Sequence, residues 1–256
     1  MLKHRNIVIL FICGIITLVF LNRTYTIHWS LYLFLFLVFL IIEFYGAYFI
    51  HSNFHIKAIC KVKTKDKVVA LSFDDGPVLQ TEKVLKVLDE FNVKATFFCI
   101  GNRIKGNEEI LKKISAKGHL IGNHSYSHGY FIDLKNTTSF VNELELANKI
   151  IHETIGKTPT FFRPPYGVTT PALARATKKL NMDVIGWNIR SLDTSIKNPQ
   201  KVLERIKERL QPGSIVLMHD TVIGIEIVLK ELLTYLKDQN YTVIALDQLL
   251  EKKAYV

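Results

Sequence analysis

Two long apolar runs near the N-terminus constrain the fold of this chain more than any other feature. Residues 6–21 are almost entirely apolar, and residues 30–50 form a second run that carries one charge, Glu43. A helix needs about 20 residues to cross the ~30 Å hydrocarbon core of a bilayer, so the second run is long enough and the first is marginal. No small-residue cleavage pattern follows the first run. We therefore predict a membrane anchor over residues 1–54 with two transmembrane helices, about 6–21 and 30–50; a buried soluble hairpin is the alternative.

Basic residues beside these runs bear on membrane orientation. Lys3 and Arg5 precede the first run, only Arg23 lies between the runs, and five lysines follow within residues 57–67. Basic flanks stay on the cytoplasmic side. We predict an integral protein of the bacterial cytoplasmic membrane with both termini inside, whereas a first run that does not span would put the following domain outside.

The rest of the chain alternates short apolar runs with segments of helical periodicity. All seven prolines lie after residue 50, so the composition changes there, and we predict a linker over 55–66 and one domain over 67–256. Strand–helix alternation favours a parallel sheet with crossover helices. No glycine-rich phosphate loop is present, which disfavours a dinucleotide-binding sheet, and we predict an α/β barrel or near-barrel. The expected strands are 68–73, 95–100, 119–122, 160–163, 183–187, 214–218 and 242–246.

Charge and cysteine content narrow the classes of partner. The net charge is +10, which would suit anionic lipid headgroups or an acidic polymer, or reflect only a solvated basic surface. The chain has no recognisable nucleic-acid motif, and we predict no nucleic-acid partner. Cys13, Cys60 and Cys99 form no CxxC pair, so neither a disulfide framework nor a thiolate metal site is indicated.

Polar residues follow most of the predicted strands. Asp74 and Asp75 end the first, His124 the third, Arg163 the fourth and His219 the sixth, and the fifth leads on to Asp193. In a parallel barrel the C-terminal strand ends gather on one face, where active sites are built. One such ending is ordinary, but five on one rim predict an active site.

His124 and His128 stand in the sequence NHSYSH. A four-residue separation would place both imidazoles on one side of a helical turn. Two histidines and one carboxylate form a ligand set that leaves positions open for water and substrate. We predict a divalent metal here, zinc first, although cobalt, nickel and manganese accept the same ligands.

The adjacent carboxylates of LSFDDGP fit the same site. A cation can bind one of them, and the other can act as base on a water molecule whose pKa the cation lowers. Neighbouring side chains on a strand point to opposite faces, so the chain must turn here if both are to reach one site. Gly76-Pro77 is expected to supply the turn.

Three further residues have the chemistry to complete such a site. His219 could protonate a leaving group, Asp193 could orient that histidine, and Arg163 could hold Asp74 ionised through a bidentate contact. Taken alone, each also fits a structural role: a satisfied core histidine or an ordinary ion pair.

Five ordered motifs resemble those of the NodB-like polysaccharide deacetylases, which are metal-dependent carbohydrate esterases. The resemblance covers about residues 66–250 and implies a distorted (β/α)7 barrel, here preceded by the transmembrane hairpin. The motifs are LSFDDGP at 71–77, HSYSH at 124–128, RPPYG at 163–167, WNIRSLDT at 187–194 and LMHD at 217–220.

The resemblance also implies a role for each site residue. Zinc or a similar ion would be bound by Asp75, His124 and His128. Asp74 would be the general base, tethered by Arg163, and His219 the general acid, tuned by Asp193. The backbone N–H of Tyr166 would hold the oxyanion with the metal. Substrate would be contacted by Pro165, Trp187 and Leu217, with Trp187 and Leu217 shaping the pocket for the acetyl methyl.

The fourth motif departs from the family pattern. The family often has Asp-x-x-Asp-Trp, whereas this chain has Arg190, Asp193 and Thr194 at those positions. The retained Asp193 preserves the chemistry, but the groove wall differs, and Arg190 would suit a phosphate or carboxylate on the substrate.

These features predict a membrane-anchored deacetylase that removes the N-acetyl group of an amino sugar in a polysaccharide or lipid-linked glycan. Removal of an O-acetyl or formyl group uses the same site, and a non-catalytic glycan-binding protein on this scaffold is the rival, although it would need neither base nor acid. Chitin, peptidoglycan, capsule or exopolysaccharide and a polyprenyl-linked precursor all remain open as substrates, and no oligomeric state is indicated.

Overall fold

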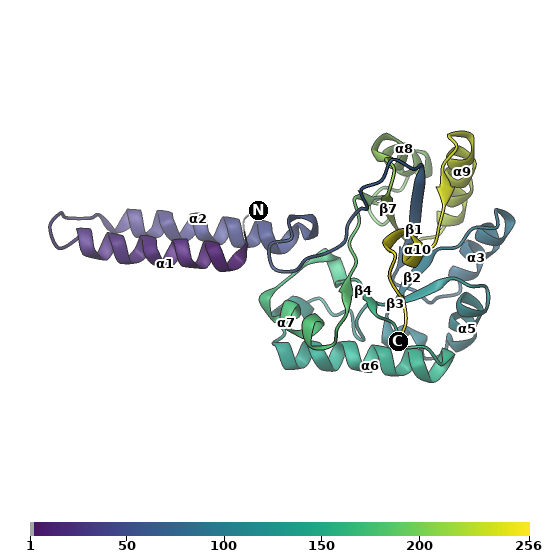
Figure 1. The fold of residues 1–256 in the computed structure, drawn as a ribbon, viewed down its shortest axis with the longest axis horizontal. Coiled ribbons are helices and arrows are strands. Elements are labelled where there is room, and N and C mark those ends of the chain that lie inside the picture. The colour runs from purple at the N-terminus through teal and green to yellow at the C-terminus, as the bar shows by residue number, and fades with distance from the viewer. Residues whose placement is uncertain (1–2) are drawn as a thin grey trace.

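The N-terminal residues form a helical hairpin that projects from an α/β domain (Figure 1). The structure is a computed structural model that describes residues 3–256. Helices α1 (His4–Leu21) and α2 (Trp29–Tyr48) lie side by side and follow the two predicted runs to within two residues at each end. Phe11 stacks on Phe39 with ring centroids 4.4 Å apart, so apolar contacts join the two helices.

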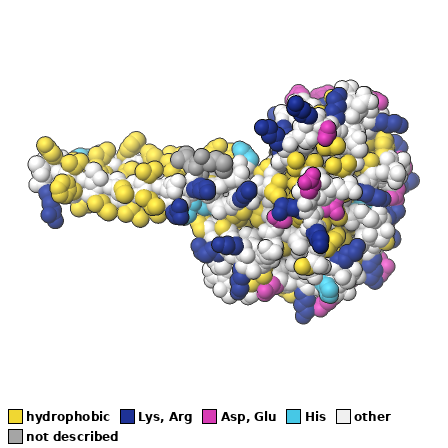
Figure 2. All heavy atoms as spheres, viewed as in Figure 1, with side chains coloured by type: hydrophobic (Ala, Val, Ile, Leu, Met, Phe, Trp, Pro, Cys, Tyr) yellow, Lys and Arg dark blue, Asp and Glu magenta, His cyan; other side chains and the backbone are white. Residues whose placement is uncertain are grey.

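Both hairpin helices are apolar on all sides. Large side chains on each are more than half exposed, among them Leu10, Phe20, Phe34, Ile41 and Phe44. Figure 2 shows hydrophobic side chains over much of the face of the hairpin that is in view. A helix that is apolar all round is typical of a protein core or a membrane span. With 18 and 20 residues, both helices are long and apolar enough to cross a membrane by length and composition.

The hairpin is joined directly to the α/β domain. His4 Nδ1 lies 2.9 Å from Glu43 Oε1, which links the start of α1 to the end of α2. The backbone N–H of Thr169, in the α/β domain, donates to the carbonyl of Ala47 at 2.9 Å. The C-terminal end of α2 therefore packs against the domain.

A curled, all-parallel sheet forms the centre of the domain, in the order β5-β4-β3-β2-β1-β7-β6, with β8 paired to the start of β1. Each of the seven predicted strands overlaps an observed one, and the short β6 was not predicted. The strands are β1 (Val68–Asp74), β2 (Thr96–Cys99), β3 (Leu120–Asn123), β4 (Phe161–Phe162), β5 (Asp183–Val184), β6 (Ile189–Arg190), β7 (Ser214–His219) and β8 (Thr242–Val243).

Helices cover the outside of the sheet (Figure 1). Their local signals are those in the sequence: Thr170 and Asn198 cap α7 and α8 ahead of a proline at the first helical position, and Gly156 ends α6 with a φ of +71°. The helices are α3 (Thr81–Glu90), α4 (Gly101–Ile104), α5 (Glu108–Ala116), α6 (Thr137–Ile155), α7 (Pro171–Lys179), α8 (Pro199–Arg209), α9 (Ile225–Asp238) and α10 (Leu246–Leu250), with 3-10 turns η1 (Ile50–Ser52), η2 (Ile132–Leu134) and η3 (Pro165–Gly167).

The sheet is a half-barrel whose open side is covered by the chain that leads in from the hairpin. Within the described residues, β5 and β6 are the two ends of the strand order. Between them, Ile59 exchanges backbone hydrogen bonds with Val184 and Gly186, each 2.9 Å long, and the N–H of Val62 donates to Gly213 at 2.9 Å. Residues 55–66, predicted as a linker, are thus packed along the domain.

The register of the strands gathers their C-terminal ends on one rim. Asp74 pairs with His219 on β7 and with Phe98 on β2, and Cys99 pairs with Asn123 on β3. The polar residues that follow these strands therefore meet at one end of the sheet, as the sequence predicted.

Candidate active site

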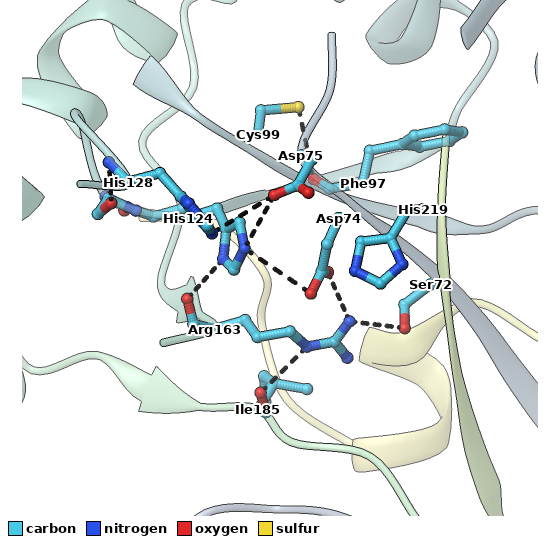
Figure 3. A network of polar contacts seen from close by, with 12 residues as sticks. Ser72, Asp74, Asp75, Phe97, Cys99, His124, His128, Arg163, Ile185 and His219 are labelled. Carbon is cyan, nitrogen blue, oxygen red and sulfur yellow. Dashed lines mark hydrogen bonds and ion pairs between the residues drawn. The ribbon is translucent and has the colours of Figure 1, made fainter. Parts of the chain in front are cut away.

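Strand β1 ends at Asp74, and the next residue turns the chain. Asp75 has a φ of +79°, a left-handed conformation that few residues other than glycine adopt. Both carboxylates consequently reach the same site (Figure 3). The turn predicted at Gly76-Pro77 begins one residue earlier. Gly76 serves a different purpose, since a Cβ there would lie 2.2 Å from Asp220 Oδ2.

Asp75, His124 and His128 form a three-ligand cluster. One ligand atom from each lies within 4.8 Å of the others, and Asp75 Oδ1 is 3.6 Å from His124 Nε2 and 3.5 Å from His128 Nε2. His124 Nδ1 donates to the carbonyl of Arg163 at 2.8 Å, which leaves Nε2 free to ligate. Asp75 Oδ1 is buried without a hydrogen-bond partner in the described chain. An orphaned carboxylate oxygen beside two imidazole nitrogens is a donor set that fits a divalent metal.

The protonation states in this cluster favour a cation. Burial alone would raise the pKa of Asp75, but the charges of His124, His128, His219 and Arg103 lower it below its ordinary value. Burial, with the nearby His124, lowers the pKa of His128 to about 4. An ionised carboxylate and a neutral imidazole are the forms in which these side chains bind metal.

The two histidines lie in a loop, and the prediction of a helical turn was wrong. His124 follows β3, and positive φ angles at Ser125 (+62°) and His128 (+47°) fold the loop back. Their ring centroids are 4.9 Å apart. Side-chain caps replace helical hydrogen bonds here: Asn123 Oδ1 accepts from the N–H of Ser125, and Ser125 Oγ accepts from the N–H of His128.

Glu143 on α6 fixes this loop from outside, a contact that sequence reasoning missed. Its Oε2 accepts from the N–H groups of Tyr126 (3.2 Å) and Ser127 (2.8 Å), and Oε1 accepts from Ser127 Oγ and pairs with Lys135. A signal was present: Glu143 falls among the buried apolar positions Phe140, Leu144 and Ala147 of an otherwise amphipathic helix.

Arg163 holds Asp74 in the interior beside the cluster (Figure 3). Its Nη1 donates to Asp74 Oδ1 at 2.7 Å and to Ser72 Oγ at 2.9 Å. The predicted bidentate contact is wrong, because Nε and Nη2 donate instead to the carbonyls of Ile185 and Gly186. The arginine is fully buried, so Asp74 has a fixed cationic partner and its Oδ2, 3.8 Å from His124 Nε2, faces the cluster.

His219 stands at the end of β7, next to Asp74 in the sheet. Asp193 holds it with both oxygens: Oδ1 is 2.7 Å from His219 Nδ1, and Oδ2 accepts from the backbone N–H at 2.7 Å. Burial alone would lower the pKa of His219, but the hydrogen bond and charge of Asp193, helped by Asp74 and Asp75, raise it above its ordinary value. With Nδ1 occupied, Nε2 is the nitrogen left to exchange a proton.

These groups surround a small cavity of about 150 Å³. Trp187 and Leu217, predicted to contact substrate, line it, whereas Pro165 is buried and lies outside the lining. Tyr166 lines it in a left-handed conformation with a φ of +58°. The full lining is Asp74, Asp75, His124, His128, Tyr166, Gly167, Trp187, Arg190, Thr194, Leu217 and His219.

Two other residues touch the site without having been assigned to it. Arg103 Nη1 donates to the backbone carbonyl of Asp75 at 2.6 Å and steadies its unusual conformation. Asp220 is fully buried behind Gly76, where burial raises its pKa to about 7, and Thr81 Oγ1 donates to its Oδ2 at 2.6 Å. The LMHD motif was a signal for Asp220, whereas Arg103, an exposed residue of the short helix α4, gave none.

Known proteins are similar to this chain in sequence and in fold. The polysaccharide deacetylase family model matches residues 61–185. The peptidoglycan-N-acetylmuramic acid deacetylase PdaA of Bacillus subtilis (strain 168) is 32% identical over 195 residues, 74% of each chain. The peptidoglycan-N-acetylglucosamine deacetylase PgdA of Listeria monocytogenes serotype 1/2a (strain 10403S) is 32% identical over 81% of this chain, which spans only 44% of that protein.

Solved structures agree with the sequence matches. The peptidoglycan N-acetylglucosamine deacetylase Bc1960 superposes with a TM-score of 0.72 at 28% identity, covering 76% of this chain and 93% of that one. BA3943 of Bacillus anthracis, described as a CE4 family pseudoenzyme, gives a TM-score of 0.71 at 28% identity, covering 77% of this chain and 70% of that one. The motifs, the half-barrel and these matches together show that this chain belongs to the polysaccharide deacetylase family.

Proposed function

We propose that this protein is a membrane-anchored, metal-dependent hydrolase that removes the N-acetyl group of an amino sugar in a glycan. The observation that carries the proposal is the composition of the small cavity. A carboxylate fixed by Arg163 and an imidazole fixed by Asp193 both face it, next to a three-ligand cluster. Residues 67–256 would form the catalytic domain, residues 1–54 the anchor and residues 55–66 the connection between them.

Asp75, His124 and His128 would hold the divalent cation, zinc being the first candidate. When bound, such a cation lowers the pKa of a water molecule and polarises the acetyl carbonyl. The residues of the chain would do the rest. Asp74, paired with Arg163, takes a proton from the attacking water. His219, protonated and held by Asp193, gives a proton to the amine nitrogen as the C–N bond breaks, so that acetate and a free amine leave.

Two further groups would position the substrate. The backbone N–H of Tyr166 would donate to the carbonyl oxygen as negative charge develops on it. The left-handed conformation of Tyr166 is compatible with this role, because strained backbone is concentrated at functional sites. Trp187 and Leu217, at the wall of the cavity, would enclose the acetyl methyl.

The names of the relatives indicate the class of acetylated glycan. The relatives named above act, by their names, on N-acetylglucosamine or N-acetylmuramic acid in peptidoglycan, which supports an amino sugar and an amide bond. An O-acetyl ester or a formamide would pass through a similar tetrahedral intermediate, so acetate release from N-acetyl and O-acetyl sugars has to be compared directly.

A non-catalytic glycan-binding protein is the competing function, and BA3943, described as a CE4 family pseudoenzyme, has a similar scaffold. Against it stands the complete set of groups in this chain. One site holds the base candidate Asp74 with its partner Arg163 and the acid candidate His219 with its partner Asp193. The three-ligand cluster lies in the same site. Glycan binding alone needs neither a base nor an acid.

The test is acetate release by the purified full-length protein from acetylated amino-sugar oligomers. We expect release with added zinc and its loss after chelation. Asp75→Ala should abolish both bound metal and release, whereas His152→Gln, which changes an exposed histidine on α6, should leave both unchanged. Full activity of the chelated protein would remove the proposed mechanism, and no activity on any acetylated sugar, with metal bound, would favour the non-catalytic function.

A further inference from the structure

A second, larger cavity lies between the end of the hairpin and the rim of the active site. Its volume is about 520 Å³. One wall is the end of α2 and the turn after it, including Tyr48, Phe49 and His51; the other is β6 and α8, with Arg190, Arg205 and Arg209. Tyr166, Trp187 and Arg190 line both this cavity and the catalytic cavity. The two spaces therefore lie next to each other.

The larger cavity is strongly cationic. Three arginines line it, and within the described chain no Asp or Glu is among its lining residues. The carboxylate paired with them is that of Glu208, 3.3 Å from Arg209 and itself 71% exposed. Burial lowers the pKa of Arg205, and the neighbouring charges of Arg209 and Arg190 lower it further, against a raising effect of Glu208. This arrangement of like charges costs free energy that a bound anion would recover.

The arginines are held in place, yet keep donors free. Arg205 Nε donates to the carbonyl of Arg190 at 2.9 Å, and Arg209 Nη1 donates to the carbonyl of Arg205 at 3.2 Å. The guanidinium of Arg190 lies 5.8 Å from the centroid of the Trp187 ring, and its Nε is buried with no hydrogen-bond partner among residues 3–256. A buried guanidinium nitrogen without an acceptor can donate a hydrogen bond to an oxyanion.

The position of the cavity relative to the hairpin identifies where that oxyanion would come from. Tyr48 and Phe49 end the second apolar helix, and both are exposed. Aromatic residues at such a place are typical of the membrane–water interface. The arginines would then lie at the depth of the lipid phosphate groups. The catalytic cavity would lie on the side of the arginines that faces away from the bilayer.

We propose that this arginine-lined cavity binds the phosphate of a lipid-linked acetylated amino sugar and so places the acetyl group in the adjoining catalytic cavity. The inference rests on the proposed deacetylase function and narrows it to a substrate still attached to the membrane. Guanidinium groups suit phosphate because their planar donors match its oxygens. Hydrolysis would leave the phosphate untouched.

The experiment compares three acetylated probes in acetate release by the zinc-loaded full-length protein in vesicles. They are N-acetylglucosamine joined to farnesol through a diphosphate, the same sugar as a neutral farnesyl glycoside, and soluble N-acetylglucosamine 1-phosphate. We expect kcat/KM for the diphosphate-linked probe to exceed that for the neutral lipid by about tenfold or more. Arg209→Gln and Arg190→Gln should reduce this preference, and Lys201→Gln, which removes an exposed charge elsewhere on α8, should retain it.

Each other result overturns a defined part of the inference. Equal rates for the diphosphate and neutral lipids would refute phosphate recognition while leaving the deacetylase function standing. Equal rates for the soluble and lipid-linked phosphates would refute attachment to the membrane. A preference that disappears when phosphatidylglycerol is added to neutral vesicles would show that the arginines hold bulk headgroups instead.

A binding measurement tests the phosphate site separately from the proposed deacetylase function. If no probe releases acetate, the affinity of the diphosphate-linked probe is measured by fluorescence titration on the His219→Gln protein. Binding that weakens about tenfold in the His219→Gln/Arg209→Gln double variant, and not with Lys201→Gln, would retain the phosphate site in a protein without this activity. Absence of binding would overturn the site as well.

Discussion

Two side chains proposed to react in the catalytic cavity, His219 and Asp74, are each held by a buried partner. Asp193 is the clearest case, because both of its oxygens contact His219. The pKa of His219 is raised in the folded protein. The proton is therefore held to higher pH than on a free histidine, and the stabilisation that the pair gives is fully present below the unfolded pKa and lost as the pH rises through the folded pKa.

Replacing Asp193 with Asn should move the alkaline limb of the pH–rate profile to lower pH. The amide keeps the shape of the side chain but removes the charge that favours the protonated imidazole. Complete loss of a general acid typically costs about 10²–10⁴-fold in rate, and Asp193→Asn should cost less than His219→Gln. The measurement is kcat as a function of pH with the same metal bound to both proteins. An unshifted alkaline limb would show that His219 does not act as the acid.

Arg163 makes the second pair, and its prediction concerns stability. Replacing Arg163 with Met leaves the Asp74 carboxylate buried without its cation, and breaking a buried pair in this way costs about 3–5 kcal/mol. Thermal unfolding of the full-length protein should show a Tm lower by about 10 °C. Asp74→Asn added to Arg163→Met should restore part of the loss, because no charge is then left buried. Equal stability of the single and double variants would contradict this account.

Most residues of the candidate active site could be predicted from the sequence, for a physical reason. Asp74, Asp75, His124, Arg163 and His219 follow predicted strands, and parallel strands bring their ends together. What the sequence could not give was donor geometry. Arg163 divides its donors between one carboxylate oxygen and two carbonyls, which depends on the course of the chain at Ile185 and Gly186.

Among the larger elements, the loop after β3 shows best how one element controls another. This loop carries both histidines of the metal-ligand cluster, and α6 fixes it through Glu143. Burial alone would raise the pKa of Glu143, but Lys135 and Ser127 lower it below its ordinary value. Its support of the loop is therefore present above the unfolded pKa and lost as the pH falls through the folded pKa.

Glu143→Gln should weaken metal binding without touching a metal ligand. The amide retains one acceptor, but it gives up the charge that attracts the two N–H groups and Lys135, so the loop and His128 gain freedom. Residues behind metal ligands typically change affinity by about 10–100-fold. The measurement is zinc affinity by competition with a fluorescent chelator, with Glu145→Gln, an exposed change on the same helix, as the control. Equal affinities for all three proteins would remove the role assigned to Glu143.

The boundaries of helices and strands could be predicted where local sequence signals determine them. They could not be predicted where pairing with distant strands determines them. Helices α7 and α8 begin at Thr170-Pro171 and Asn198-Pro199, as their sequences indicate. Strands β4, β5 and β6 have two residues each, because the sheet curls and pairing stops early, which apolar pattern alone does not report. The loop at His124–His128 was not predicted for a similar reason, since its conformation, with positive φ angles at Ser125 and His128, is accompanied by side-chain contacts from Asn123 and from Glu143 on α6.

The whole molecule places an apolar hairpin and a cationic cavity side by side. The apolar runs were plain in the sequence, but the cavity was not, because it is assembled from the end of α2 and from α8, which are about 150 residues apart in the chain. Of the three arginines of the cavity, Arg190 alone was singled out from the sequence, as a departure from the family pattern. Figure 2 shows basic side chains gathered where the hairpin meets the domain, an arrangement consistent with a domain that rests on an anionic membrane surface.

The orientation of the hairpin decides which substrates the catalytic domain can reach. Lys3 and Arg5 lie at the start of the chain before the first apolar run, the five lysines within residues 57–67 follow the second run, and Arg23 lies between the runs. The charge difference predicts that the domain stays on the cytoplasmic side. A fluorescent protein fused after Val256 should then fluoresce, and alkaline phosphatase fused at the same place should be inactive. Adding three lysines to the loop between α1 and α2 while changing Lys61, Lys63 and Lys65 to Gln should shift both signals toward the opposite result. Phosphatase activity in the unmodified fusion would put the domain outside, where polymeric glycans are accessible, and a lipid-linked precursor would no longer be required by location.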